Sequence, residues 1–381
     1  MDFSSVDRLL TRAVRQGVFP GAALLVRQAG EVIYRRACGL RCREPQPAPM
    51  TAETVFDLAS LTKPLATSLA VFLLIAQERL RFTDPVSRFL PDFRGGQKDR
   101  VTIRHLLSHA SGLPAWRPYF EALSSAEHRA TERPLLATRL GREWVYAQIQ
   151  REPLDATPGE RAVYSDLGFM LLGALVERLS GHALDDYCRQ HIFAPLGLPA
   201  TSFVNLEESS PGFASCAATE RCPWRGRVVC GQVHDENAYA MGGVAGHAGV
   251  FANLDDVDRL VGCLVDCYHG RHAFLPAALL HECWQRDARV PGSSRTLGWD
   301  TPSAQGSSAG QLFSVRSVGH LGFTGTSVWI DLERQVHVIL LTNRVHPSRD
   351  NTAIRTFRPR LHDAVLRAVL GKDEGRALND E

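Results

Sequence analysis

The chain has 381 residues, 44% of them hydrophobic, which is enough for a large core and more than one lobe. Its formal net charge of +2 is nearly balanced, so it lacks the basic footprint of a nucleic-acid-binding protein, and no nucleic-acid partner is expected. The N-terminus has no basic or apolar leader pattern and the longest apolar run, residues 69–76, is too short to cross a bilayer, so neither a signal peptide nor a membrane span is expected.

The first part of the chain predicts a helix, a hairpin and a second, buried helix. Residues 4–16 form the first helix, which Gly17 ends, and residues 21–27 and 31–37 form two strands around a Gln-Ala-Gly turn. The helix that follows Ser60 is apolar nearly all round, which is typical of a helix buried on every side.

The middle of the chain predicts mainly helices, broken by loops rich in proline and glycine. Residues 101–107 form a short helix. A longer helix covers residues 166–180, with Ser165 or Asp166 as its N-terminal cap and a glycine at its end. Another helix covers residues 255–268.

Strands return after residue 292, at residues 326–331 and 335–342, and an amphipathic helix at 359–370 closes the chain. Strands at both ends and helices between them predict an α/β plus α fold. One α/β lobe comes from residues 1–81 and 292–381, and a mostly helical lobe comes from residues 82–291. The active site is expected between the two lobes.

Nine cysteines are present, an odd number without the spacing of a small disulfide framework. With no export signal, reduced thiols in the cytoplasm are the simplest interpretation, and a cytoplasmic protein is expected. Cys216, Cys222, Cys230 and His234 can be drawn as a metal set, but their spacings match no common zinc pattern. Buried thiols are favoured, and no metal is expected.

Ser60-Leu61-Thr62-Lys63 is the most informative motif, because it lies where a strand-like segment runs into the apolar helix. Lysine three residues after serine lies on the same helical face. An unprotonated amine there can take the hydroxyl proton and make Ser60 a nucleophile, and the helix N-terminus favours the negative charge that develops. The alternative, that Ser60 only caps its helix, is weaker because a lysine opening an apolar helix needs a reason.

Two further segments supply what such a nucleophile needs. Tyr164 directly precedes a capped helix, and a phenol near a cationic lysine can relay protons. Residues 319–326, Gly-His-Leu-Gly-Phe-Thr-Gly-Thr, begin a strand, and their glycines let a ligand approach the backbone. An ordinary half-buried tyrosine is the alternative for Tyr164.

Taken in order, Ser60-x-x-Lys63, Tyr164-x-Asp166 and His320-x-Gly322 resemble the serine β-lactamase and penicillin-binding-protein superfamily. The nearest branch holds class C β-lactamases, family VIII esterases and D-Ala-D-Ala carboxypeptidases. Residues 106–114, Leu-Leu-Ser-His-Ala-Ser-Gly-Leu-Pro, are similar to a run of that branch, and residues 233–249 and 343–347 are similar to a subgroup linked to cell-wall metabolism. The resemblance covers nearly the whole chain.

This resemblance implies a β-lactamase-like fold, with an antiparallel sheet flanked by helices and built from both termini, and a mostly helical second lobe. It makes Ser60 the acylated nucleophile, Lys63 the base or its partner, and Tyr164 a proton relay. The backbone N–H groups of Ser60 and Phe323 would form the oxyanion hole, with Gly322 beside them. His320 would stand where β-lactamases carry the lysine of Lys-Thr-Gly.

Two departures from the family pattern matter. Asp166 replaces the asparagine of Tyr-x-Asn, which removes an amide donor and places a negative charge that holds Lys63 protonated. An N-cap is an equally good role for Asp166. His320 replaces a permanent cation with a group expected to titrate near neutral pH, which argues against strong β-lactamase activity.

Four further residues are candidates for the pocket: His234, Asp235, Asn237 and His247. The first three line the pocket, coordinate a cation, or belong to a loop that bonds to itself. His247 stands among glycines that either bring it to the site or only permit a tight turn.

The sequence therefore predicts a cytoplasmic serine hydrolase that cleaves an ester or amide through an acyl-enzyme. The substrate is expected to be a muropeptide-like, cell-wall-derived peptide or amide, or a small acyl ester, and no cofactor is implied. The alternatives are a β-lactamase, a transesterase, and a non-catalytic penicillin-recognising sensor or scaffold. The oligomeric state is not predicted.

Overall fold

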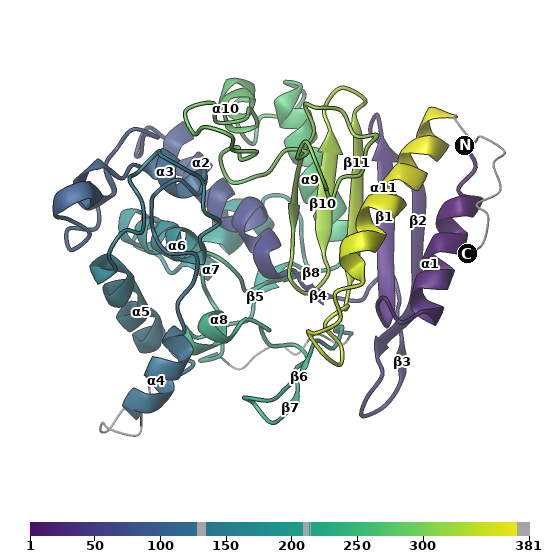
Figure 1. The fold of residues 1–381 in the computed structure, drawn as a ribbon, viewed down its shortest axis with the longest axis horizontal. Coiled ribbons are helices and arrows are strands. Elements are labelled where there is room, and N and C mark those ends of the chain that lie inside the picture. The colour runs from purple at the N-terminus through teal and green to yellow at the C-terminus, as the bar shows by residue number, and fades with distance from the viewer. Residues whose placement is uncertain (128–134, 209–212, 214, 372–381) are drawn as a thin grey trace.

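The structure, a computed structural model, describes residues 1–127, 135–208, 213 and 215–371 (Figure 1). Its centre is a six-stranded antiparallel sheet in the order β3-β2-β1-β11-β10-β9. The strands come from both ends of the chain: β1 (Gly21–Gln28), β2 (Glu31–Cys42), β3 (Ala48–Pro49), β9 (Val318–Leu321), β10 (Ser327–Asp331) and β11 (Val336–Thr342). The predicted antiparallel sheet built from both termini is confirmed.

Alternate residues of β1 divide the core between the two faces of the sheet. Leu24 and Val26 pack with α1 (Ser4–Arg15) and α11 (Ile354–Leu370), which lie together over one face (Figure 1). The intervening residues of β1 join the larger core on the other face, where α9 (Leu254–Tyr268) contacts the sheet. The strand is buried on both faces, which explains its nearly unbroken apolar run.

The remaining elements lie mostly to the other side of the molecule in Figure 1. The helices are α2 (Ser68–Ala76), α3 (Ile103–Leu107), α4 (Tyr119–Glu127), α5 (Arg139–Arg151), α6 (Asp166–Ser180), α7 (Leu184–Cys188), α8 (Glu236–Ala240) and α10 (Ala277–Cys283). Shorter turns are η1 (Ala59–Leu61), η2 (Lys63–Thr67), η3 (Val86–Arg88), η4 (Gly96–Arg100) and η5 (Arg189–Phe193). Two small sheets pair β4 (Phe56–Asp57) and β5 (Ser202–Phe203) with β8 (Val250–Ala252), and β6 (Arg221–Cys222) with β7 (Arg227–Val228).

Two predicted elements differ from those observed near the C-terminus. The last helix begins at Ile354, five residues before the predicted start, and contains Pro359. Burial of Ile354 and Phe357 in the core outweighs the hydrogen bond that the proline forfeits. Residues 319–326 do not begin a strand: residues 319–321 end β9, and residues 322–326 form the turn to β10.

The division into two lobes stays a prediction, and two helices depart from its boundary. α9, from the predicted helical lobe, packs on the sheet, whereas α2, from the predicted α/β lobe, packs against α6. Residues 128–134, 209–212, 214 and 372–381 of the predicted lobes lie outside the described residues.

Within the described ranges, two segments are long and apolar enough to cross a membrane: Ala59–Ala76, and the bent pair Asp166–Ser180 with Leu184–Phe193. Of the first segment, 83% is buried in the fold, as in a core helix.

A close backbone contact at Gly246 holds α6 against the loop that follows α8. A β-carbon at Gly246 would lie 2.0 Å from the carbonyl oxygen of Phe169 and 3.1 Å from the nitrogen of Gly173, both in α6. The carbonyl of Gly246 also accepts a 2.7 Å hydrogen bond from Thr67 Oγ1. This glycine therefore positions three segments that meet near Lys63.

Gly246→Ala should destabilise the protein by about 1–3 kcal/mol, because neither backbone neighbour can move away without shifting α6. Urea unfolding followed by circular dichroism measures this change. Gly262→Ala in α9 is the control, since a β-carbon there meets nothing within 4 Å. Equal midpoints for the two variants would contradict the contact.

Candidate active site

Ser60 lies in a backbone segment held in an uncommon conformation. Ala59, directly before it, has φ +48°, which side-chain-bearing residues seldom adopt. Its amide donates a 2.8 Å hydrogen bond to Oδ1 of the buried Asp57, which stabilises this conformation. Ser60 lies in the 3₁₀ turn η1, and the chain continues through the π-helical turn η2, which contains Lys63 and Pro64. Such turns within helices are frequent at functional sites.

The Lys63 ammonium has three oxygen neighbours, two through hydrogen bonds and one through an ion pair. Nζ lies 3.0 Å from Ser60 Oγ, 3.0 Å from the carbonyl oxygen of His247 and 2.8 Å from Asp166 Oδ1. The side chain is fully buried. Burial disfavours the charge, but Asp166 and then Tyr164 outweigh it and raise the pKa of Lys63 above its ordinary value. Lys63 is therefore held as a cation that donates to Ser60.

Asp166 is an ion-pair partner rather than a helix cap. Ser165 is the N-cap of α6, because its Oγ accepts the amide of Gly168 at 3.3 Å. This frees the Asp166 carboxylate, in the first turn, to meet Lys63. The predicted negative charge beside Lys63 is thus present, and the alternative N-cap role for Asp166 is wrong.

Tyr164 is packed among cationic and aromatic side chains. Lys63 Nζ lies 4.9 Å from the centre of its ring, and the His109 ring lies 4.5 Å away on a residue with φ +57°. His109 Nδ1 accepts the amide of Ser165 at 3.0 Å, so it fixes the backbone that carries Tyr164. Burial, followed by Arg295 and Lys63, holds the pKa of His109 well below its ordinary value. His109 is therefore a neutral positioning residue.

The turn after β9 is bonded to the segment that leads into Ser60. Thr324 Oγ1 donates to the carbonyl of Asp57 at 2.8 Å, and Thr326 Oγ1 donates to that of Leu58 at 3.0 Å. Gly322 is required there, because a β-carbon would lie 2.5 Å from the Leu58 oxygen. Phe323, next in the turn, is 49% exposed. The predicted oxyanion segment is therefore attached to the nucleophile segment.

The predicted titration of His320 near neutral pH is wrong. The ring is buried, and Nδ1 pairs with the carbonyl of Leu321 at 2.9 Å. Burial, then Lys63 and Arg295, holds the pKa of His320 well below its ordinary value. The imidazole is neutral, and its buried Nε2 has no hydrogen-bond partner. The His320 ring therefore offers a lone pair rather than a positive charge. Its centre lies 6.0 Å from the centre of the Tyr164 ring.

Arg295 is a residue of this site that no sequence pattern indicated. Its guanidinium carbon lies 5.1 Å from the centre of the Tyr164 ring, and Nη1 lies 3.3 Å from Asp300 Oδ2. It comes from the loop between α10 and β9, where neither periodicity nor spacing distinguishes one arginine from another. The fixed cation absent from position 320 is present here instead.

Of the four candidate pocket residues, Asp235 and His247 join the site most directly. Asp235 caps α8 and pairs with His247 Nε2 at 2.8 Å. Burial disfavours the Asp235 carboxylate, but His247 and the Ala238 amide hold its pKa well below its ordinary value. His247 in turn presents its carbonyl to Lys63.

His234 and Asn237 are bonded into surrounding loops. His234 Nε2 lies 3.0 Å from Glu220 Oε2, and its ring stacks on Phe323 at 5.6 Å. Asn237 accepts the amide of Phe120 at 3.0 Å and donates to the carbonyl of Arg117 at 2.9 Å. Asn237 therefore tethers a neighbouring loop, and His234 supports Phe323.

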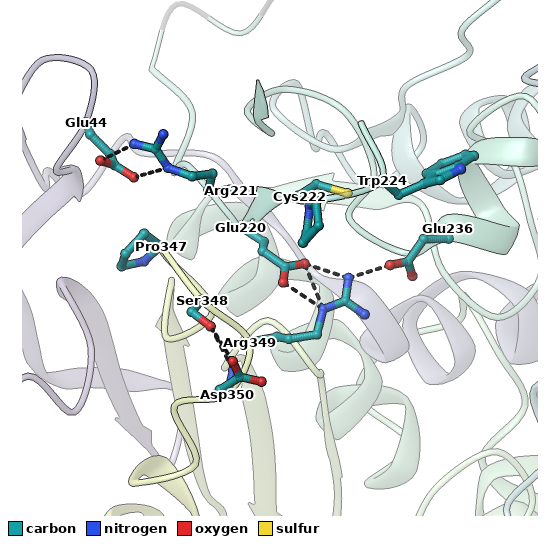
Figure 2. A pocket seen from close by; sticks show the side chains of 11 residues that line it. Glu44, Glu220, Arg221, Cys222, Trp224, Glu236, Pro347, Ser348, Arg349 and Asp350 are labelled. Carbon is teal, nitrogen blue, oxygen red and sulfur yellow. Dashed lines mark hydrogen bonds and ion pairs between the residues drawn. The ribbon is translucent and has the colours of Figure 1, made fainter. Parts of the chain in front are cut away.

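A pocket of about 580 Å³ is lined by Glu220, the partner of His234 (Figure 2). Arg349 reaches into it between Glu220 and Glu236 and also lies 6.0 Å from the Phe323 ring. Trp224 and Asp350 contribute to its rim. Arg349 is thus the lining residue that lies near Phe323 of the Ser60 site.

Comparison with known proteins agrees with this geometry. The family model described as "Beta-lactamase" matches residues 6–360. The chain is 32% identical over 369 residues to an N-acetylmuramyl-L-alanine amidase of Bacillus subtilis (strain 168), covering 90% of this chain and 80% of the relative. It is 31% identical over 371 residues to an Escherichia coli (strain K12) protein provisionally named a D-alanyl-D-alanine carboxypeptidase, covering 90% and 82%.

A solved structure also matches nearly the whole chain. EstCE1, described as a hydrolase with promiscuous acyltransferase activity, superposes with a TM-score of 0.73 and 26% identity, covering 95% of this chain and 98% of that one.

Asp166→Asn should move the rising limb of the pH profile of kcat/KM to lower pH by about one unit or more, because removal of the carboxylate lowers the pKa of Lys63. The neutral amine, which can act as a base, then appears at lower pH. Hydrolysis of an activated ester, followed from pH 6 to above pH 11 so that the profile passes the ordinary pKa of lysine, measures this, with Asp92→Asn as an exposed control. An unshifted limb would exclude Lys63 as the titrating base.

Proposed function

This chain belongs to the beta-lactamase family, whose typical mechanism is serine hydrolysis through an acyl-enzyme, and we propose that Ser60 is its nucleophile. The observation that carries the proposal is the 3.0 Å contact between Ser60 Oγ and Nζ of the fully buried Lys63. A lysine excluded from water and aimed at a serine has little structural purpose, since burial of its charge is costly.

Ser60 Oγ attacks the carbonyl carbon of an ester or amide, and its proton passes to the Lys63 amine. Lys63 must first lose a proton, and its raised pKa makes this step favourable only toward alkaline pH. Tyr164, beside Lys63, relays the proton to the departing amine or alcohol, which leaves the acyl group on Ser60. Water then cleaves the acyl-enzyme by the reverse relay, releasing the acid and restoring Ser60.

The developing negative charge on the substrate oxygen needs donors from the backbone. The amides of Ser60 and Phe323 serve as the oxyanion hole in this proposal. Support comes from the hydrogen bonds that join residues 324 and 326 to the Asp57 and Leu58 carbonyls, because they hold the two amide-bearing segments side by side. Gly322 allows the backbones to approach this closely.

The substrate is an amide of a cell-wall-derived, muropeptide-like molecule. The names of the amidase and carboxypeptidase relatives support this class. Arg295 supports it independently, because a fixed cation over Tyr164 suits a substrate that carries a carboxylate near the scissile bond. A small neutral ester would gain nothing from Arg295.

The alternatives are less well supported. A β-lactamase commonly carries a cationic lysine at the position of His320, whereas this imidazole is neutral. A non-catalytic sensor would not need a Lys63 aimed at Ser60. The cytoplasmic location stays a prediction based on the sequence, and so does the absence of a cofactor.

Ser60→Ala should abolish covalent labelling and reduce turnover by at least about 10³-fold, because no other group supplies the acylated oxygen. Intact-protein mass after incubation with a fluorophosphonate, and separately with a penicillin, measures the adduct. Ser68→Ala, a buried serine of α2, is the matched control and should keep the adduct. An adduct that persists in Ser60→Ala would refute the assignment.

Arg295→Ala should raise KM for an acyl-D-alanyl-D-alanine peptide by roughly tenfold or more, as expected for loss of a charge-assisted contact. KM for a neutral nitrophenyl ester should change little. Arg295→Lys should recover part of the loss, and Arg289→Ala, an exposed arginine of the same loop, is the control. Equal effects on both substrates would indicate a structural role for Arg295 instead.

A further inference from the structure

Two thiols and an imidazole converge at the C-terminal end of α9, outside the turn η1 that contains Ser60. Cys263 and Cys267 lie one helical turn apart, and His272 follows in the loop to α10. Their ligand atoms all lie within 4.8 Å of one another. Cys263 Sγ is 3.5 Å and Cys267 Sγ is 3.8 Å from His272 Nδ1.

These separations are those of a tetrahedral zinc site. With zinc bonds of about 2.3 Å to sulfur and about 2.0–2.1 Å to nitrogen, a tetrahedral angle puts sulfur and nitrogen about 3.6 Å apart. The two observed distances lie on either side of this value.

Two backbone amides of the loop after α9 point at two of the three ligand atoms. The amide of Leu275 donates to Cys267 Sγ at 3.4 Å. The amide of Phe274 lies 3.1 Å from His272 Nδ1, so that nitrogen carries a lone pair and not a proton. A bound ion would take this lone pair from the amide.

The graded solvent exposure of the three residues also fits an ion-binding site. Cys267 is buried, Cys263 is partly buried and His272 is exposed, so an ion can enter from the surface and meet a dry inner ligand. The other group of possible ligands, Glu220, Cys222 and Glu236, is different. There the Arg349 guanidinium already pairs with both carboxylates (Figure 2).

We propose that Cys263, Cys267 and His272 bind one Zn²⁺ ion through two thiolates and Nδ1, with water as the fourth ligand. Binding releases the two thiol protons to solvent and involves no redox change. The ion would join the end of α9, whose other side packs on the sheet, to the loop that leads into α10. This site is independent of the proposed hydrolase chemistry.

Cobalt(II) is the spectroscopic probe for this site. Metal-free full-length protein titrated with Co²⁺ should develop near-ultraviolet sulfur-to-cobalt absorption that saturates at one equivalent, and added Zn²⁺ should displace it. The Cys263→Ser/Cys267→Ser double variant should lose the band, whereas Cys230→Ser, which removes the exposed thiol, should keep it. No band in the parent protein, or a band retained in the double variant, would overturn the proposal.

His272→Ala protects the test against misfolding, because this residue is exposed. The variant should bind Zn²⁺ more than about tenfold more weakly, measured by competition with a chromophoric chelator. One equivalent of Zn²⁺ should raise the melting temperature of the parent but not of this variant. Equal zinc affinity in both would overturn the site, whereas Ser60 labelling tests the hydrolase separately.

Discussion

The buried Lys63 ammonium is the interaction on which the rest of the site depends. An uncompensated charge in the interior costs several kcal/mol, so its oxygen partners must stay in place for the fold to persist. Those partners belong to three segments: Ser60 in η1, Asp166 in α6 and the His247 carbonyl in the loop after α8. One charge therefore sets the relative position of nucleophile, helix and loop.

The parts of this arrangement that are local in sequence were predictable. The three-residue spacing of Ser60 and Lys63 was enough to expect their contact, and the Ser-Asp pair at the start of α6 was enough to expect a cap, although not which residue forms it. The return of strands near the C-terminus indicated a sheet built from both ends.

What the sequence could not supply depends on burial and on long-range contact. His320 would titrate near neutral pH only if water reached its ring. Its burial beside Lys63 and Arg295 depends on how distant segments pack. Arg295 reaches Tyr164 across more than a hundred residues of chain. Pro359 was expected to begin the last helix, yet the core contacts of α11 extend the helix to residues before it. For His320 and α11, tertiary structure outweighed a local expectation, and for Arg295 the sequence offered none.

The pairing of β1 with β11 has a consequence for folding during synthesis on the ribosome. Ala22 pairs with Thr342, so the central strand of the sheet must wait for nearly the whole polypeptide before its second neighbour exists. Until then its apolar residues present an open edge, which is a template for pairing with other chains. High contact order of this kind slows folding. The edge of β1 is therefore exposed for a long interval. A chaperone that shields this edge during that interval would raise the yield of folded protein.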